Sequence, residues 1–262
     1  MKYYVVADVH GYYTPMKKAL KDAGFFEEKE PCKLIVCGDL LDRGKEANQT
    51  VDFMMQLLKE GKLIYIRGNH EDLFVRCLQE IASGGVHEIA SGMSVHHQNG
   101  TWDSLLQISS MGELEAYNNA SELVRRVRNS QFYKKLLSEC VDYFETQNYI
   151  FTHGWIPCKT YGFYPRLEYK YNENWRNANV IEWGKARWYN GMDIACRFHA
   201  IVPNKTTVCG HWHASYGHSK FEKKGDEVGK NADYTPFYGK GIIAIDACTA
   251  RSGIVNCVVI ED

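Results

Sequence analysis

The sequence predicts an α/β fold built around a parallel β-sheet. Three observations support this prediction: short apolar runs typical of buried strands, amphipathic helices between the first three runs, and polar residues directly after the runs. Strands that alternate with helices form parallel sheets with right-handed crossovers. Because α/β proteins bind ligands beyond the carboxyl ends of such strands, we expect the polar residues to meet at one edge.

The apolar runs are short and rich in β-branched and aromatic side chains, as in strands that are buried on both faces. Five of them precede polar residues, and they cover residues 3–7, 34–37, 63–66, 149–152 and 206–209. Two later runs, 242–246 and 254–260, predict the two strands of a hairpin or of a second sheet.

The segments between the first three runs predict amphipathic helices. The first has Thr14 as a candidate N-cap, Pro15 as its first helical residue and Gly24 as its end. Apolar residues recur in it at the i, i+3, i+4, i+7 spacing of a helix that buries one face. The same spacing recurs in residues 51–58 and 74–81. The first 80 residues are therefore expected to be βαβαβα.

The regular alternation ends after residue 82. Residues 83–119 are rich in Gly, Ser, Asn and Met, and residues 121–145 are again typical of helix. We therefore expect 83–145 to be a mostly helical insertion within a single domain that covers residues 1–262. The aromatic-rich segment 155–188 is a candidate for partner binding in addition to any catalysis.

Composition excludes several classes of protein. With 262 residues, a net charge of −1 and a pI near 6.8, the chain is not expected to bind nucleic acid through a broad basic surface. No apolar stretch approaches the length of a membrane span, and Asp8 and His10 interrupt the N-terminal run, so no signal peptide is expected. Nine scattered cysteines without CxxC spacing predict free thiols and a cytoplasmic protein.

Polar motifs follow five of the apolar runs in chain order. They are Asp8-x-His10, GDxxDRG at 38–44, GNHE at 68–71, His153-Gly154 and Gly210-His211-x-His213. GDxxDRG alone has five fixed residues and should occur by chance in roughly one sequence in 10⁴ of this length. Its place between the other motifs, each after a predicted strand, indicates a functional site.

Together these motifs resemble the signature of the calcineurin-like metallophosphoesterase superfamily. Within it, GDxxDRG with GNHE is similar to the serine/threonine phosphoprotein phosphatase family of bacterial and phage type. The resemblance spans residues 8 to about 213. It implies a four-layer α/β/β/α sandwich and a dinuclear metal centre that hydrolyses phosphoesters with metal-activated water.

The resemblance also implies a set of metal ligands. Asp39 would be the carboxylate shared by both cations, with Asp8 and His10 completing the first site. The second site would be completed by Asn69, His153 and His211. A mixed set of carboxylate, imidazole and amide donors suits manganese, iron or zinc, and we expect two divalent ions, with manganese the most active in vitro.

His213 departs from the phosphoprotein phosphatase pattern. Many members of that family have no second histidine after the GH, whereas GHxH is common in the wider superfamily, where the second histidine ligates the first metal. We therefore expect His213 to be a seventh ligand.

The remaining site residues follow from the same resemblance. His70 and Asp42 would form a general-acid pair, because a carboxylate beside an imidazole raises its pKa and fixes its tautomer. Arg43 would bind phosphoryl oxygens, for which a planar guanidinium is well suited. Arg187 is the candidate for a second arginine with this role, and Asn69 would also contact the phosphate.

The function expected from these residues is that of a protein serine/threonine phosphatase, with a dual-specificity enzyme that also accepts phosphotyrosine as a variant of it. A symmetrical dinucleoside polyphosphate hydrolase is the alternative within the superfamily, and GHW at 210–212 favours it. A phosphodiesterase or nuclease is favoured by GHxH but opposed by the near-neutral charge. A catalytically inactive binding module is opposed by the intact ligand set. The substrate is thus a phosphorylated protein or a small phosphoester, with no membrane partner, and the oligomeric state stays open.

Overall fold

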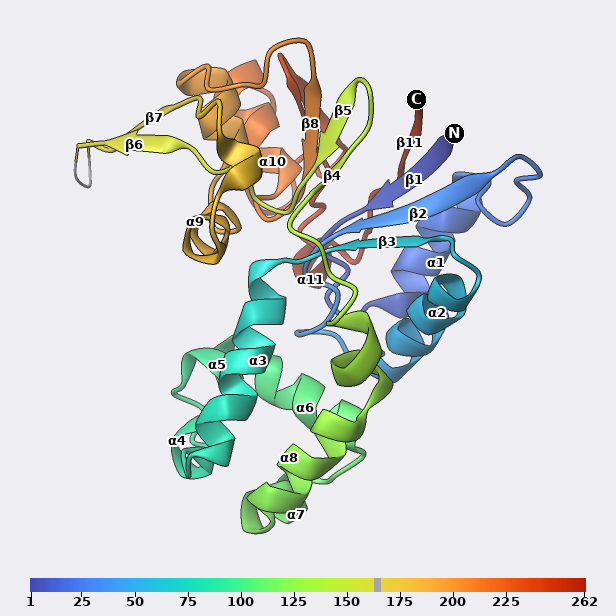
Figure 1. Cartoon of the computed structure of the whole chain (residues 1–262), viewed down its shortest axis with the longest axis vertical. Helices are drawn as coiled ribbons and strands as arrows, with labels where there is room; N and C mark the ends of the chain where they lie inside the picture. Colours follow the sequence, from blue (N-terminus) through green and yellow to red (C-terminus); the bar gives the residue numbers. More distant parts are fainter. Residues whose placement is uncertain (163–165) are drawn as a thin grey trace.

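The protein has two β-sheets that pack against one another, with helices on both outer sides (Figure 1). This computed structural model describes residues 1–162 and 166–262. The α/β fold class predicted from the sequence is confirmed. None of the helices in the described part of the chain has the length and apolar character needed to cross a bilayer. All nine cysteines lie in that part and carry free thiols.

The first sheet contains the N-terminal strands in the order β11-β1-β2-β3. Its strands are β1 (Lys2–Val6), β2 (Cys32–Cys37), β3 (Leu63–Ile66) and β11 (Val258–Glu261). The first three are parallel and in register, and β11 pairs antiparallel with β1. The parallel arrangement places the carboxyl ends of β1, β2 and β3 at one edge, as the alternation of strands and helices predicts.

The second sheet has the order β4-β5-β8-β10-β9. Its strands are β4 (Phe144–Glu145), β5 (Tyr149–Phe151), β8 (Thr206–Cys209), β9 (Phe237–Gly239) and β10 (Ile242–Ala244). β5, β8 and β10 are parallel, and β4 and β9 are antiparallel edge strands. A separate two-stranded sheet, β6 (Lys159–Tyr161) with β7 (Glu168–Lys170), extends from the body as an arm (Figure 1).

A buried layer of apolar side chains packs between the two main sheets. Val5 and Ile35 of the first sheet belong to the same buried cluster as Phe151 and Val208 of the second, and all four are fully buried. Burying such side chains contributes about 1.5–3 kcal/mol each. This layer sets the carboxyl ends of the two sheets side by side.

Helices cover the outer faces and form a separate helical region. The N-terminal helices are α1 (Tyr13–Asp22), α2 (Ala47–Lys59) and α3 (Asn69–Ala82). The region beyond them holds α4 (Val86–Ala90), α5 (Val95–Gln98), α6 (Thr101–Ser109), α7 (Glu113–Asn118), α8 (Ala120–Asn129) and η1 (Phe132–Leu136). These helices project from the strand ends in Figure 1. The single-domain organisation, with the insertion bounded at 83–145, stays a prediction.

The C-terminal half has short helical segments between its strands. They are η2 (Trp175–Asn177), α9 (Val180–Ala186), η3 (Asp193–Arg197), α10 (Ala214–Gly217), η4 (His218–Glu222) and α11 (Thr249–Ser252). Trp155, Trp175 and Trp183 form the centre of the buried cluster on this side of the second sheet. The aromatic richness of this segment is thus explained largely by core packing.

The predicted N-terminus of α1 was wrong, and the prediction for the two C-terminal runs holds only for the first of them. Helix α1 begins at Tyr13, and Thr14 is not its N-cap, because the Thr14 N–H and hydroxyl bind the Glu46 carboxylate instead. The runs 242–246 and 254–260 do not pair as a hairpin either. The first forms β10 in the second sheet, and the second forms β11 beside β1, so the C-terminus links the two sheets.

The carboxylate of Glu71, at the start of α3, joins the loops that follow β2 and β3. Its Oε2 accepts the N–H of Asp39 at 3.0 Å and of Gly68 at 2.6 Å. Its Oε1 accepts the N–H of Leu40 at 3.0 Å and the hydroxyl of Tyr65 at 2.7 Å. Burial and the nearby Asp39 raise the pKa of the Glu71 carboxyl, and the bonds from Tyr65 and Leu40 offset only part of this effect.

Replacing Glu71 by glutamine should destabilise the fold while leaving its shape unchanged. The amide offers one accepting oxygen in place of two, so two of the four donors lose their acceptor. Each buried unsatisfied donor costs about 1–3 kcal/mol, which predicts a loss of about 2–6 kcal/mol in the free energy of unfolding. Urea denaturation measures it. Glu88→Gln on the exposed face of α4 is the control and should stay within about 0.5 kcal/mol of the wild type.

Candidate functional site

The polar motifs that follow the strands meet at one place. The His153 imidazole Nε2 lies 3.3 Å from Asp39 Oδ1 and 2.7 Å from Asn69 Oδ1. The main-chain N–H of His211 donates to Asp8 Oδ2 at 2.9 Å. These five residues follow β1, β2, β3, β5 and β8, so strands of both sheets contribute to one site. The convergence expected from the topology is therefore present in the structure.

An unusual backbone conformation directs these side chains into the site. Positive φ angles, rare for residues with a Cβ atom, occur at six of the predicted site residues. They are Asp8, His10, Asp39, Asp42, Arg43 and His211, with φ between 50° and 77°. A Cβ atom at Gly68 would collide with the Asp39 carboxylate, and one at Gly210 with that of Asp8. The glycines of GNHE and GH are thus needed for the close approach of the loops.

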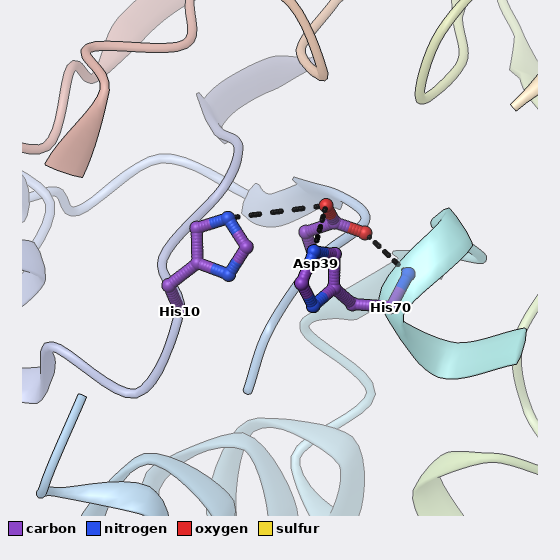
Figure 2. Close-up of side chains that lie close together, drawn as sticks. All are labelled: His10, Asp39 and His70. Atoms are coloured by element: carbon purple, nitrogen blue, oxygen red, sulfur yellow. Dashed lines mark hydrogen bonds and ion pairs between the residues drawn. The ribbon is translucent and has the colours of Figure 1, made fainter. Parts of the chain in front are cut away.

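One group of potential metal ligands consists of His10, Asp39 and His70, whose donor atoms lie within 4.8 Å of one another (Figure 2). Asp39 Oδ2 is 3.9 Å from His10 Nε2 and 3.8 Å from His70 Nε2. These separations are too long for hydrogen bonds. Figure 2 shows both imidazoles directed toward the Asp39 carboxylate, and all three side chains are buried.

A second group consists of Asp39, His153 and His211, again with donor atoms within 4.8 Å of one another. Asp39 therefore belongs to both groups, and its two oxygens face different histidines: Oδ2 faces His10, and Oδ1 faces His153. A carboxylate in this position can bind two cations at once. Among the described residues, neither group includes Asp8 or His213.

The histidines are oriented as metal ligands require. His10 Nδ1 is 3.0 Å from the Leu41 carbonyl oxygen, and His153 Nδ1 is 2.8 Å from that of Cys37. A ring nitrogen that donates to a main-chain carbonyl leaves the lone pair of Nε2 free for a cation. The 2.7 Å between His153 Nε2 and Asn69 Oδ1 also suits two ligands of one ion. The residues present therefore fit a dinuclear metal centre.

Charges within this buried cluster strongly perturb one another. Burial lowers the pKa of His153, but Asp39 and Asp8 outweigh this effect and raise it to about 10. Burial and the neighbouring His153 lower the pKa of His211 to about 3. Burial raises the pKa of Asp39, but the surrounding histidines hold it well below its usual range. The imidazoles around Asp39 thus favour its carboxylate form, which is the form that can bind cations.

His70 forms a pair with Asp42 beside the metal-ligand groups. His70 Nδ1 is 2.7 Å from Asp42 Oδ2, and both side chains are buried. Burial lowers the pKa of His70, but Asp39 and Asp42 outweigh it and raise the pKa above its ordinary value. The exposed Arg43 places Nη2 3.3 Å from His70 Nε2. The Arg43 guanidinium and the His70 imidazole therefore lie side by side next to the metal-ligand groups.

Helix α6 of the helical region supports this pair, which the sequence did not indicate. The Thr101 hydroxyl donates to Asp42 Oδ2 at 2.8 Å, and Ser104 Oγ accepts the Asp42 N–H at 2.9 Å. Both residues are buried. Some sixty residues separate them from Asp42, and they belong to no motif, so only the tertiary structure reveals them.

Asp246 is a further buried acid that the motifs did not include. Its Oδ1 accepts the Cys248 N–H at 2.6 Å, and its main-chain oxygen accepts the Ala214 N–H at 2.8 Å. Burial raises the pKa of Asp8 well above its usual range, and the nearby Asp246 adds to this effect. Asp246 ends the apolar run 242–246. A polar residue at a strand end was the signal that could have identified it.

Arg187 and His213 belong to neither group and have partners of their own. The guanidinium of Arg187 binds Asp72 at 2.7 Å and also Asp142, and it is buried. His213 Nε2 is 3.3 Å from Glu227 Oε1, at the start of α10. Phosphate binding by Arg187 and metal binding by His213 stay predictions.

The chain is similar to proteins with two different named activities. It is 33% identical over 82 residues to the asymmetrical bis(5′-nucleosyl)-tetraphosphatase PrpE of Anoxybacillus flavithermus, a match that covers 29% of this chain and 34% of that protein. It is also 33% identical over 70 residues to serine/threonine-protein phosphatase 1 of Salmonella typhimurium, covering 27% of this chain and 30% of that protein. The chain thus spans about a third of the length of each relative.

The fold and the family are shared more widely. The crystal structure of a cold-active protein-tyrosine phosphatase from a psychrophilic Shewanella species has a TM-score of 0.51 and 16% identity, covering 100% of this chain and 75% of that one. This likeness concerns the fold alone. The family model described as calcineurin-like phosphoesterase matches residues 1–215, which include all five motifs. The chain therefore belongs to the calcineurin-like phosphoesterase family.

Proposed function

We propose that this chain hydrolyses a dinucleoside polyphosphate, such as diadenosine tetraphosphate, at an asymmetrical position with the aid of two divalent cations. The observation that carries the hydrolytic part is the Asp39 carboxylate, shared by two groups of donor atoms, with the His70–Asp42 pair beside them. Similarity to the asymmetrical tetraphosphatase of Anoxybacillus flavithermus supports the nucleotide substrate. GHW at 210–212, which favours a symmetrical hydrolase, supports a dinucleoside polyphosphate substrate but not the asymmetrical position of the cut.

In this proposal the side chains around Asp39 hold the cations. Asp8 and His10 complete the first site, with His213 as a further ligand. Asn69, His153 and His211 complete the second site. Two bound divalent cations would activate a water and neutralise charge on the phosphoryl oxygens. The mixture of nitrogen and oxygen donors suits manganese, iron or zinc, and we expect manganese to support activity in vitro.

The other residues bind the phosphate and deliver a proton. Arg43 is exposed at the site and can pair two of its N–H groups with phosphoryl oxygens. Asn69 and Arg187 are the further phosphate-binding candidates. His70 Nε2 is the proton donor to the leaving oxygen, and Asp42 holds the proton of Nδ1 and thereby orients the ring.

A second candidate is a protein serine/threonine phosphatase, and the intact His70–Asp42 pair favours it. A serine alkoxide is a poor leaving group that needs a proton, whereas a nucleoside phosphate leaves readily without one. Similarity to the Salmonella phosphatase also supports this candidate. The two functions differ in substrate but require the same metal centre.

A substrate panel with added manganese separates the two candidates. We expect diadenosine tetraphosphate to be hydrolysed with a higher kcat/KM than a phosphoserine peptide. Chromatography of the products identifies the bond that is cut, because asymmetrical cleavage yields AMP with ATP and symmetrical cleavage yields two ADP. A preference for the phosphopeptide would instead establish the second candidate, and two ADP would exclude the asymmetrical cut.

Asp39→Asn should abolish the dinuclear centre. The substitution keeps the shape of the side chain but removes the negative charge that holds two cations together. We expect the purified variant to retain no more than about one tightly bound metal per chain and to lose nearly all hydrolysis. Metal content is measured by mass spectrometry after dialysis against manganese. Asp22→Asn, an exposed change on α1, is the control and should bind metal as the wild type does.

A variant with two metals and normal turnover would refute this role of Asp39. His213→Ala should have a milder effect, because Asp8 and His10 remain at the first site.

His70→Asn should affect substrates according to their leaving group. The variant cannot donate a proton, so kcat for an alkyl phosphate such as glycerol 2-phosphate should fall by about 10²–10⁴-fold. The loss with p-nitrophenyl phosphate should be far smaller, because p-nitrophenolate leaves without protonation. Steady-state kinetics on both substrates test this. An equal loss on the two would make His70 a structural or electrostatic residue and not the acid.

A further inference from the structure

Trp188 is an exposed aromatic side chain at the edge of the site. Its indole is 51% exposed, although four other tryptophans, Trp102, Trp155, Trp175 and Trp183, are buried. Its ring centroid is 5.7 Å from that of His211, with an angle of 84° between the planes. Trp188, with the largest of all side chains, is therefore about half exposed to solvent directly beside a candidate metal ligand. Core packing does not account for this position.

The segment that carries Trp188 is firmly anchored. The Trp188 N–H donates to the Lys185 carbonyl at 3.0 Å, in the turn that ends α9. The preceding residue, Arg187, is buried and ion-paired with Asp72 of α3 and with Asp142. Asp72 lies three residues beyond Asn69 in the same helix. The same ion pair thus ties the Trp188 turn to the helix that begins at the metal centre.

A second indole lies on the chain next to the same histidine. Trp212 is half-buried, and its ring is 6.1 Å from that of His211 and 6.2 Å from that of His213, with which it is nearly parallel. Trp212 packs against the buried cluster of the second sheet, whereas Trp188 does not belong to that cluster. Of the two, Trp188 is therefore the one with a ring free to receive a ligand.

A rigid, exposed indole beside a phosphate site is suited to bind a flat aromatic group. Nucleobases stack on tryptophan, and such stacking contributes to binding largely independently of which base it is. A peptide backbone offers no such aromatic face. The charge of the substrate would be bound by the metal centre and Arg43, so Trp188 would add affinity for what is attached to the phosphate.

We propose that Trp188 stacks on a nucleobase of the substrate and is the residue that makes the site prefer nucleotides to simple phosphoesters. The inference rests on the proposed function, because it requires a phosphoryl group at the metal centre beside His211. It adds a specificity-determining residue, outside the five motifs, that touches the part of the substrate that does not react.

The test compares AMP with ribose 5-phosphate, which share sugar and phosphate and differ in the base. Isothermal titration calorimetry of the manganese-loaded protein measures both affinities, with chromatography to verify that each ligand is recovered intact. We expect the wild type to bind AMP about 5- to 150-fold more tightly, the range that stacking of one base provides. Trp188→Ala should bind the two ligands within about twofold of each other, with unchanged affinity for ribose 5-phosphate.

Two further variants make the result specific. Trp188→Phe retains an aromatic face and should keep a large part of the preference for AMP. Tyr238→Ala removes another exposed aromatic ring, on the edge strand β9, and should leave it unchanged. Thermal melting should be close to that of the wild type for all three variants, since each ring is exposed in the native state.

The inference is overturned if the wild type fails to prefer AMP, or if Trp188→Ala weakens both ligands equally. It is separable from the proposed function. A protein that does not cleave diadenosine tetraphosphate but shows a Trp188-dependent preference for AMP would refute the proposed substrate and retain the stacking role. If the protein cleaves diadenosine tetraphosphate but the wild type and Trp188→Ala bind AMP equally well, the proposed substrate is retained and the stacking role is refuted.

Discussion

The site depends on one buried carboxylate, that of Glu71. Its four hydrogen bonds hold the main chain after β2 and the main chain after β3 in one arrangement, with Tyr65 as the fourth donor. Asp39 lies on the first of these loops, and Asn69 and His70 begin the helix after the second. A ligand shared by two cations must be placed within fractions of an ångström, and loops at strand ends do not provide this by themselves.

The loops around the site are held in a conformation that most residues avoid. Residues with Cβ atoms adopt positive φ in the loops after β1, β2 and β8, and each such residue costs of order 1 kcal/mol or more. The hydrogen bonds between the loops offset this cost, including His211 N–H to Asp8 and His70 N–H to Asp39 at 2.9 Å. The stability of the two packed sheets therefore supports the geometry of the centre.

Two regions outside the motifs complete the site. Helix α6 of the helical region binds Asp42 through Thr101 and Ser104, and so orients His70. The turn after α9 places Trp188 next to His211, while Arg187 of the same turn is ion-paired with Asp72. The predicted metal ligands thus lie at the strand ends, whereas side chains of the helical region and of the aromatic-rich segment lie around them.

Sequence alone determined the α/β class and the strands that end at the site, because buried strands and the polar motifs after them are local signals. Even so, it misplaced the start of α1, where a bond between Thr14 and Glu46 replaces the cap. It also placed two C-terminal runs together in a hairpin or a second sheet, whereas only the first run joins the second sheet. The resemblance already implied that Asp39 is shared, and the tertiary structure added that its two oxygens face different histidines. The tertiary structure alone revealed Thr101 beneath Asp42 and an exposed Trp188 beside His211, since contacts across many residues leave no local pattern in a sequence.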